Sequence, residues 1–287
     1  MTLEKFLLRF GRGMGRLLSC TPMFLHRPLA VFLVGIGIFC NPKRFFLSAA
    51  NVKRVFPDLS KPGVLRCVFL SYLNLSYVLL EFLQIPWLSE HRLSGCIETT
   101  GMEYFDQALS CGRGVILLTA HFGNWEFMGQ FLALHGYPLS SLVKTQKHLL
   151  LDREINCLRA MHGMEIINKG FGLREAVKTL ERNRILGLLL DQDAKDQGIM
   201  SPFLGIPAST AVSLAKLHQR FGSPVVPSFI TRRGYFRFLI QAGPMLDMTH
   251  CGEQEIVDEC NRIISQKIME HPEQWLWLHN RWRTVKS

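Results

Sequence analysis

Short apolar runs and helically spaced apolar residues alternate along the chain from about residue 100 onward. Runs bounded by turn residues are typical of buried strands, and apolar residues three and four apart are typical of amphipathic helices. The predicted strands are 115–119, 140–143, 164–167, 185–190, 225–230 and 236–241. The predicted helices are 102–110, 124–135, 150–162, 172–183, 209–221 and 253–270. Because strands and helices alternate, we predict an α/β fold with helices on both faces of a sheet.

The first 45 residues have a different pattern, in which basic residues are interleaved with apolar ones. The basic residues of the first turns are Lys5, Arg9, Arg12 and Arg16. An uncharged apolar run follows at 29–40, and its twelve residues fall short of the roughly 20 that span a bilayer. We interpret residues 1–45 as an N-terminal helical membrane-associating segment whose cations face anionic lipid. Residues 46–287 are then a single α/β domain.

Two other interpretations of this N-terminal segment remain open. A basic start before an apolar core also fits a signal peptide, although Cys40-Asn41-Pro42 is a poor cleavage site. A helical hairpin packed on the domain has the same composition, and it can bind a membrane as well.

The stretch 64–83 has a helical period and carries one acid, Glu81. An unpaired carboxylate is costly to bury in so apolar a segment. We expect Glu81 to pair with an arginine or to reach a functional site, and a solvent-facing position is the alternative.

Composition narrows the class of protein. Apolar residues make up 48% of the 287 residues, and 33 Lys and Arg against 23 Asp and Glu give a net charge of +10. Such a chain suits contact with an anionic membrane or an acidic partner. The sequence has no helix-turn-helix, zinc-finger or RNA-binding signature, so we expect no nucleic-acid partner. The eight scattered cysteines form no C-x-x-C pair, which indicates a reducing compartment and no zinc site.

One motif follows a predicted strand directly. His121 lies two residues beyond strand 115–119, and Glu126 lies in the first turn of helix 124–135, for which Asn124 is a suitable N-cap. A tight turn can bring Glu126 back to one imidazole nitrogen and leave the other free. A histidine oriented by a carboxylate activates a hydroxyl group for attack. We predict this role for His121, although a structural core histidine gives the same pattern.

Two acids, Asp191 and Asp193, end the apolar strand 185–190. The carboxyl ends of parallel strands meet at one edge of a sheet, where α/β proteins build their sites. We therefore expect both acids near His121, with one facing the cleft and the other capping the next turn. Because no further His or acid cluster completes a coordination shell, we predict no metal site.

Three further segments contain candidate site residues. Arg159, in helix 150–162, can stabilise an oxyanion, and a surface ion pair is its alternative. The loop 203–208 is predicted to open helix 209–221 with Ser209 or Thr210 as its cap, and a phosphate can bind at this helix start or the hydroxyl simply caps the helix. The tail 275–283 combines three Trp, a His and two Arg, which suits either a lipid-headgroup boundary or core packing.

These segments, in this order, resemble the bacterial lipid A biosynthesis acyltransferases, the late acyltransferases of the lysophospholipid acyltransferase-like superfamily. The matching pieces are Asn51 to Pro57, Glu81, His121 to Glu126, Arg159, Asp191 to Asp193, Phe203 to Gly205 and Trp277 to Trp282. The resemblance implies a mixed sheet flanked by helices, like the core of glycerol-3-phosphate acyltransferases. The family often has an Arg soon after the strand that follows helix 124–135, and here Lys144 stands near that position. Lysine lacks the planar guanidinium of arginine, which can donate two parallel hydrogen bonds.

The resemblance implies an O-acyltransferase without a cofactor. The donor would be an acyl-carrier-protein or CoA thioester, and the acceptor a hydroxyl of a lipid A precursor or related glycolipid. The enzyme would be peripheral or single-pass at the inner membrane and would face the cytoplasm. His121 would be the base, Glu126 would orient it and Arg159 would stabilise the oxyanion. The substrate-binding candidates are Lys144, Asp191, Asp193, Ser209 and Arg281.

Two functions from other classes remain open. A lipid esterase or thioesterase would apply the His121–Glu126 pair to water and release free fatty acid. A non-catalytic lipid-binding membrane protein would keep the apolar and basic surfaces and would not depend on His121.

Overall fold

A central mixed sheet forms the body of the protein in the computed structural model, which describes residues 3–143, 148–168 and 172–284. Its strand order is β1-β9-β8-β2-β5-β3-β4, and every neighbouring pair is parallel except β8 with β9. The strands are β1 (Ile97–Thr100), β2 (Val115–Thr119), β3 (Leu139–Val143), β4 (Glu165–Asn168), β5 (Ile185–Leu189), β8 (Val225–Gly234) and β9 (Arg237–Ala242). The predicted α/β class, with a mixed sheet flanked by helices, is confirmed.

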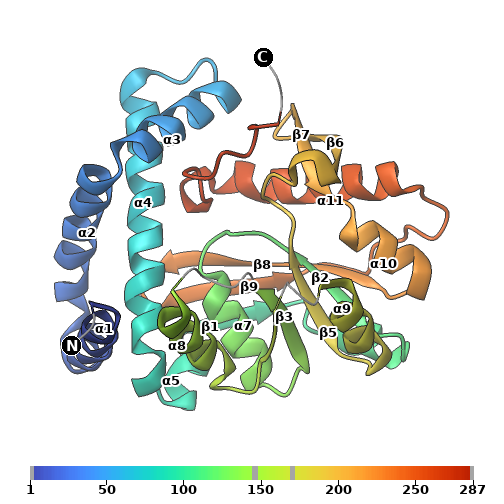
Figure 1. Cartoon of the computed structure of the whole chain (residues 1–287), viewed down its shortest axis with the longest axis horizontal. Coiled ribbons are helices and arrows are strands. Elements are labelled where there is room, and N and C mark those ends of the chain that lie inside the picture. The colour runs from blue at the N-terminus through green and yellow to red at the C-terminus, as the bar shows by residue number, and fades with distance from the viewer. Residues whose placement is uncertain (1–2, 144–147, 169–171, 285–287) are drawn as a thin grey trace.

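Helices cover both faces of this sheet, and a helical layer stands beside it (Figure 1). The N-terminal helices are α1 (Leu3–Cys20), α2 (His26–Cys40), α3 (Pro42–Val55) and α4 (Lys61–Gln84). The helices of the domain body are α5 (Glu90–Gly95), α6 (Glu103–Ser110), α7 (Trp125–Leu134), α8 (Leu149–Ala160), α9 (Gly172–Glu181), α10 (Ser213–Phe221) and α11 (Glu253–Glu270). Long helix α4 lies between α1 and α2 on one side and the sheet on the other.

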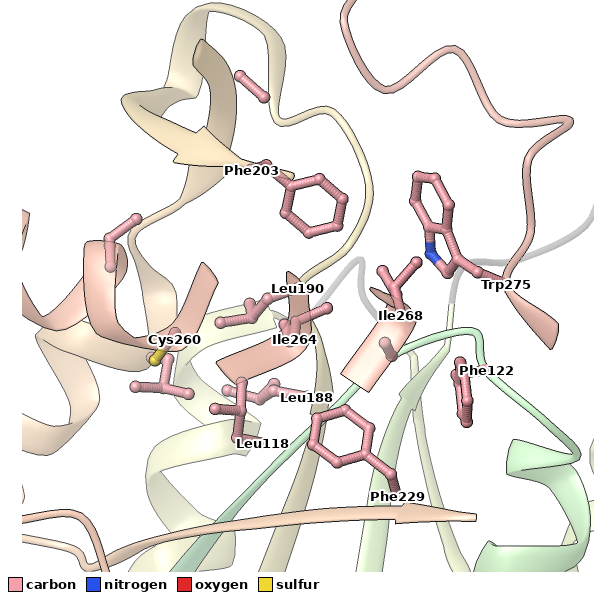
Figure 2. Close-up of a cluster of buried hydrophobic side chains, with 14 of the residues drawn as sticks. Leu118, Phe122, Leu188, Leu190, Phe203, Phe229, Cys260, Ile264, Ile268 and Trp275 are labelled. Carbon is pink, nitrogen blue, oxygen red and sulfur yellow. The ribbon is translucent and has the colours of Figure 1, made fainter. Parts of the chain in front are cut away.

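The alternation of side chains along β2 divides the core into two clusters. Ile116 and Leu118 belong to the cluster that α11 covers, whereas Val115 and Leu117 belong to the cluster beneath α7. Figure 2 shows the first cluster, where Leu118 and its neighbours from β5 face side chains of α11. Burying one such leucine contributes about 1.5–3 kcal/mol. Packing on both faces therefore holds β2 and β5 rigidly at the centre of the sheet.

The predicted strands and most predicted helices lie within a few residues of their expected positions, but the segment after β5 differs. The hairpin of β6 (Gly198–Phe203) and β7 (Ile206–Ala211) replaces the expected loop and the first turn of helix 209–221. Leu204 and Gly205 both have positive φ, 52° and 78°, which fits a tight two-residue hairpin turn. The predicted helix start at Ser209 is therefore wrong, and so is a phosphate site at that helix start.

The N-terminal helices present apolar side chains outward. Phe32 and Phe39 on α2 are 64% and 87% exposed. By length and composition two stretches, Met23–Cys40 and Lys61–Trp87, could cross a membrane, and only 17% of the first is buried against 44% of the second. The apolar helix α2 is thus a candidate membrane-associating element, whereas α4 packs against the body of the domain.

Hydrogen bonds join this N-terminal layer to the domain body. His26 on α2 is buried, with its ring nitrogens 2.9 Å from the Thr21 hydroxyl and 2.8 Å from the Tyr235 hydroxyl. Burial lowers the pKa of His26, which favours the neutral ring. Arg12 on α1 donates two hydrogen bonds to Glu154 on α8. These contacts fix the position of α1 and α2 against the domain.

Glu81, the single acid of α4, forms a buried ion pair with Arg232 of β8. The exposed fractions of the two side chains are 0% and 7%, and the second guanidinium nitrogen donates to Glu81 at 2.7 Å. Asn124 donates to the same carboxylate at 2.7 Å, and Asn74 accepts from Arg232 Nε at 2.7 Å. The expectation that Glu81 pairs with an arginine is confirmed. The pair joins α4, β8 and the start of α7.

We predict that Glu81→Gln lowers the free energy of unfolding by about 3–5 kcal/mol, because it leaves the Arg232 cation buried without its counter-charge. The matched control is Glu259→Gln, which breaks an exposed pair with Arg262 and should cost less than about 1 kcal/mol. Urea unfolding of both variants in the same detergent measures the difference. Equal losses would contradict the structural role given to the buried pair.

Candidate active site

The register between β2 and β5 brings two polar side chains to one point on the sheet edge. Thr119 pairs with Leu189 at the ends of these parallel strands. Two residues farther along each chain stand His121 and Asp191. The predicted meeting of these two residues at the carboxyl edge follows directly from that register.

Asp191 holds the imidazole of His121. The Nδ1 atom of His121 lies 2.9 Å from Asp191 Oδ1, and the backbone N–H of His121 donates to Oδ2 at 3.1 Å. The indole of Trp275 donates to the same Oδ2 at 2.9 Å. An ionised carboxylate only accepts hydrogen bonds, so Nδ1 carries the proton and the neutral ring presents the lone pair of Nε2.

The charges of this pair depend on each other. Burial by itself would raise the pKa of Asp191, but the charge of His121 and the hydrogen bonds from His121 and Trp275 lower it to about 2. Burial would lower the pKa of His121, but the Asp191 charge and hydrogen bond outweigh it and raise that pKa above the ordinary value. Asp191 therefore stays ionised, and His121 is a stronger base than a free histidine.

Glu126 has a different partner from the one predicted. Its carboxylate accepts from Arg159 Nε at 2.9 Å and Nη2 at 2.5 Å, and from Trp125 Nε1 at 3.2 Å. The prediction that Glu126 orients His121 is therefore wrong, because the first turn of α7 directs its carboxylate to α8. The bidentate ion pair instead holds Arg159 beside the site.

The end of α8 that carries Arg159 is anchored to α7. The amide of Gln130 donates to the backbone carbonyls of Leu158 and Arg159, at 3.3 and 2.9 Å, and Gln130 is fully buried. This anchor and the ion pair fix the guanidinium from two directions. The guanidinium of Arg159 is thus preorganised before any ligand binds.

A cavity of about 300 Å³ adjoins these residues. Its polar lining includes His121, Glu126, Arg159 and Gln192. Its apolar lining consists chiefly of Leu117, Met128, Leu139, Leu142, Met164 and Leu189. A cavity that combines a base and a cation with apolar walls can hold a polar reacting group together with a hydrocarbon chain.

The turn that carries His121 is held by its own sequence. Gly123 has φ of 60°, and a Cβ there would lie 1.8 Å from the Ile230 carbonyl oxygen, so only glycine fits. Asn124 caps α7 by accepting from the Phe127 N–H at 3.0 Å, as predicted. Because Asn124 also donates to Glu81, the buried ion pair of α4 supports the turn that carries His121.

We expected one of the two acids to face the cleft and the other to cap the next turn, and Asp193 does neither. Its carboxylate accepts from the Thr284 hydroxyl at 2.8 and 2.9 Å, and its backbone N–H donates to His279 Nε2 at 3.0 Å. It makes no side-chain cap on the short helix that follows. Asp191 is the acid at the cleft, and Asp193 secures the C-terminal tail.

Two other substrate-binding candidates, Ser209 and Arg281, do not line the cavity. Ser209 and Arg281 are buried, 1% and 0% exposed. The Ser209 hydroxyl donates to the Lys195 carbonyl, and Arg281 donates to the Gln192 and Ser209 carbonyls and to the Thr210 hydroxyl. These contacts tie the tail to the β6–β7 hairpin and do not support a substrate-binding role. Lys144 lies outside the described residues.

The indole of Trp275 is a site residue whose role the sequence did not indicate. Trp275 pairs with Phe122 in an isolated β-bridge, and the Gly123 N–H donates to the Gln274 carbonyl at 3.1 Å. Only folding brings the tail to the turn that carries His121. Trp275 and Asp191 are 84 residues apart in the sequence, and no local pattern predicts a contact over that separation. In the described ranges, no group of three or more His, Cys, Asp or Glu is arranged to hold a metal ion.

Known proteins match the chain over nearly its whole length. The family model described as bacterial lipid A biosynthesis acyltransferase matches residues 2–284. A phosphatidylinositol mannoside acyltransferase of Mycobacterium tuberculosis is 25% identical over 242 residues, which cover 81% of this chain and 75% of that protein. The lipid A biosynthesis palmitoleoyltransferase and lauroyltransferase of Escherichia coli are each 22% identical, over 91% and 88% of this chain and 87% and 85% of their own lengths.

We predict that Asp191→Asn lowers kcat/KM for the reaction that His121 catalyses by about 10²–10⁴-fold, because the ring loses the partner that sets its tautomer. In the wild type, kcat/KM should fall as the pH falls through the raised pKa of His121, since protonation removes the base. Loss of the Asp191 charge lowers that pKa, so the acid limb of the variant should shift to lower pH.

The matched control for this variant is Asp193→Asn, which removes an equal charge two residues away and leaves His121 with its partner. Its pH profile should coincide with that of the wild type. A pH–rate series on both variants makes the comparison, and an unshifted acid limb in Asp191→Asn would contradict the assignment.

Proposed function

We propose that this chain, which belongs to the bacterial lipid A biosynthesis acyltransferase family, transfers a fatty acyl chain from a thioester to a hydroxyl of a glycolipid. That it is an acyltransferase follows from its family and its relatives. The observation that carries the mechanism is the 2.9 Å hydrogen bond between His121 Nδ1 and the buried Asp191 carboxylate, beside the cavity.

In the proposed reaction, His121 Nε2 takes the proton of the acceptor hydroxyl as its oxygen attacks the thioester carbonyl. The resulting tetrahedral intermediate collapses, the carbon–sulfur bond breaks, and the proton on Nε2 passes to the leaving thiolate. Asp191 stays ionised throughout and stabilises the imidazolium that forms between the two steps. The fixed tautomer makes the base ready without rearrangement.

Arg159 is proposed to stabilise the oxyanion of the intermediate. Glu126 engages its Nε and Nη2 donors, whereas Nη1 makes no hydrogen bond within the described part of the chain. A preorganised cation in a cavity of low polarity stabilises developing negative charge without the cost of reorientation. In this proposal Glu126 is the residue that positions Arg159, and the donor's acyl chain lies along the apolar wall of the cavity.

The proposed donor and acceptor rest on the chemistry of the site and on the family to which the chain belongs. The donor is an acyl-carrier-protein or CoA thioester, and the acceptor is a lipid A precursor or a related glycolipid. Relatives named for lipid A and for phosphatidylinositol mannoside support a glycolipid acceptor. Residues 1–45 would hold the enzyme on the inner membrane with the site facing the cytoplasm, where both donors occur, and the exposed apolar face of α2 supports this placement.

We predict that His121→Ala lowers acyl transfer by about 10²–10⁴-fold while the protein stays folded. The assay follows radiolabelled acyl-CoA and acyl-carrier-protein, each with a tetra-acylated lipid A precursor, and separates acylated lipid from free fatty acid. The control is His250→Ala, an exposed histidine outside the cavity. Label recovered only as free fatty acid from the wild type would favour a hydrolase, and an unchanged rate in His121→Ala would contradict the mechanism.

A further inference from the structure

A second, apolar hollow begins where the catalytic cavity ends. One cavity of about 580 Å³ lies between α2, α4 and α8, and another of about 600 Å³ lies between α1, α4 and α8. Both are lined by Leu79, Phe82 and Ile155, so they adjoin each other, and we call the two together the lateral groove. Figure 1 shows the bordering helices, with α2 and α8 on either side of the lower part of α4.

The lateral groove and the catalytic cavity share a wall. Trp125, Glu126 and Arg159 line both, and His121 lies against this wall with its ring centroid 5.2 Å from that of Trp125. A molecule seated in the groove therefore has one end at the residues that flank the base.

The other end of the groove reaches the lipid-facing surface of the N-terminal layer. Leu33 and Ile36 line it from α2, and Phe32 and Phe39, which lie one helical turn before and after Ile36, are among the most exposed apolar side chains. A hydrocarbon chain can thus pass from a bilayer into the groove without crossing water, which avoids the free-energy cost of exposing its methylene groups to water.

The groove also has a cation at its rim. Arg44 and Asn41 line it at the start of α3, and both are exposed. Arg44 donates to the Leu278 carbonyl at 3.1 Å and makes no ion pair among the residues that the structure describes. A guanidinium of this kind suits the phosphate or other anionic group of a lipid head.

We propose that the lateral groove holds a hydrocarbon chain of the acceptor lipid, with its anionic headgroup at Arg44 and its reacting hydroxyl at the shared wall. The inference rests on the proposed acyl transfer, and it places the acceptor lipid of that reaction in the lateral groove. A thioester donor arrives from water, whereas an acceptor that stays in the membrane enters sideways between α2 and α8. The two chains then lie on opposite sides of the Glu126–Arg159 bridge.

Photolabelling tests this location without requiring turnover. The probe is phosphatidylglycerol with a diazirine near the end of one acyl chain, in phosphatidylethanolamine vesicles carrying the full-length protein. Label should reach Phe82 and Ile155 inside the groove, and excess tetra-acylated lipid A precursor should compete for it. Ile36→Trp, which fills the groove from α2, should reduce that label about ten-fold, the factor produced by 1.4 kcal/mol.

The matched control is Val31→Trp, which adds the same side chain to an exposed position of α2 that does not line the groove. Its interior labelling should equal that of the wild type. Label confined to the outer face of α2 in the wild type, or equal interior label in both variants, would overturn the groove assignment while leaving the proposed transfer reaction intact.

Kinetics separate the acceptor from the donor. Ile36→Trp and Arg44→Gln should raise the KM for the lipid acceptor about ten-fold and leave the KM for the thioester donor near its wild-type value. Lys43→Gln, beside Arg44 but not on the groove, should change neither. A raised donor KM with an unchanged acceptor KM would place the donor chain in the groove and would refute the inference.

Discussion

The buried carboxylate of Asp191 is the constraint on which the site depends. A desolvated anion at the centre of a sheet edge is unfavourable unless several donors meet it. Three do so here, from the ring and backbone of His121 and from the indole of Trp275. The same contacts that stabilise the anion fix the position, tautomer and basicity of the His121 imidazole. The C-terminal tail must therefore reach the turn that carries His121 before the site is complete.

A second buried charge connects the site to the N-terminal helical layer. The Glu81–Arg232 pair belongs to α4 and β8, and through Asn124 it also holds the first turn of α7. Helix α4 has α1 and α2 on its other side, so one element contacts the helix with the exposed apolar surface and also supports the turn that carries His121. A lipid bound beside α4 is consequently close to the reacting groups, as a membrane-bound acceptor requires.

The sequence predicted what local patterns determine and missed what the tertiary fold decides. Buried strands and the His121 turn follow from apolar periodicity and from glycine and asparagine placement. The partners of the two motif residues do not follow from local patterns. His121 meets Asp191 because of the register between two strands, and Glu126 pairs with Arg159 on another helix. The β6–β7 hairpin was missed because its turn uses Leu204 in a left-handed conformation, which sequence rules reserve for glycine or asparagine.

The central claim is that Asp191 holds His121 with its proton on Nδ1, which leaves Nε2 as the base. Nitrogen-15 NMR of the ring-labelled protein in detergent, assigned with a variant that lacks His121, reports both the tautomer and the pKa. The account predicts a neutral ring protonated at Nδ1 and a pKa above 6.5, the ordinary value for histidine. A neutral ring protonated at Nε2, or a pKa below that value, would contradict it.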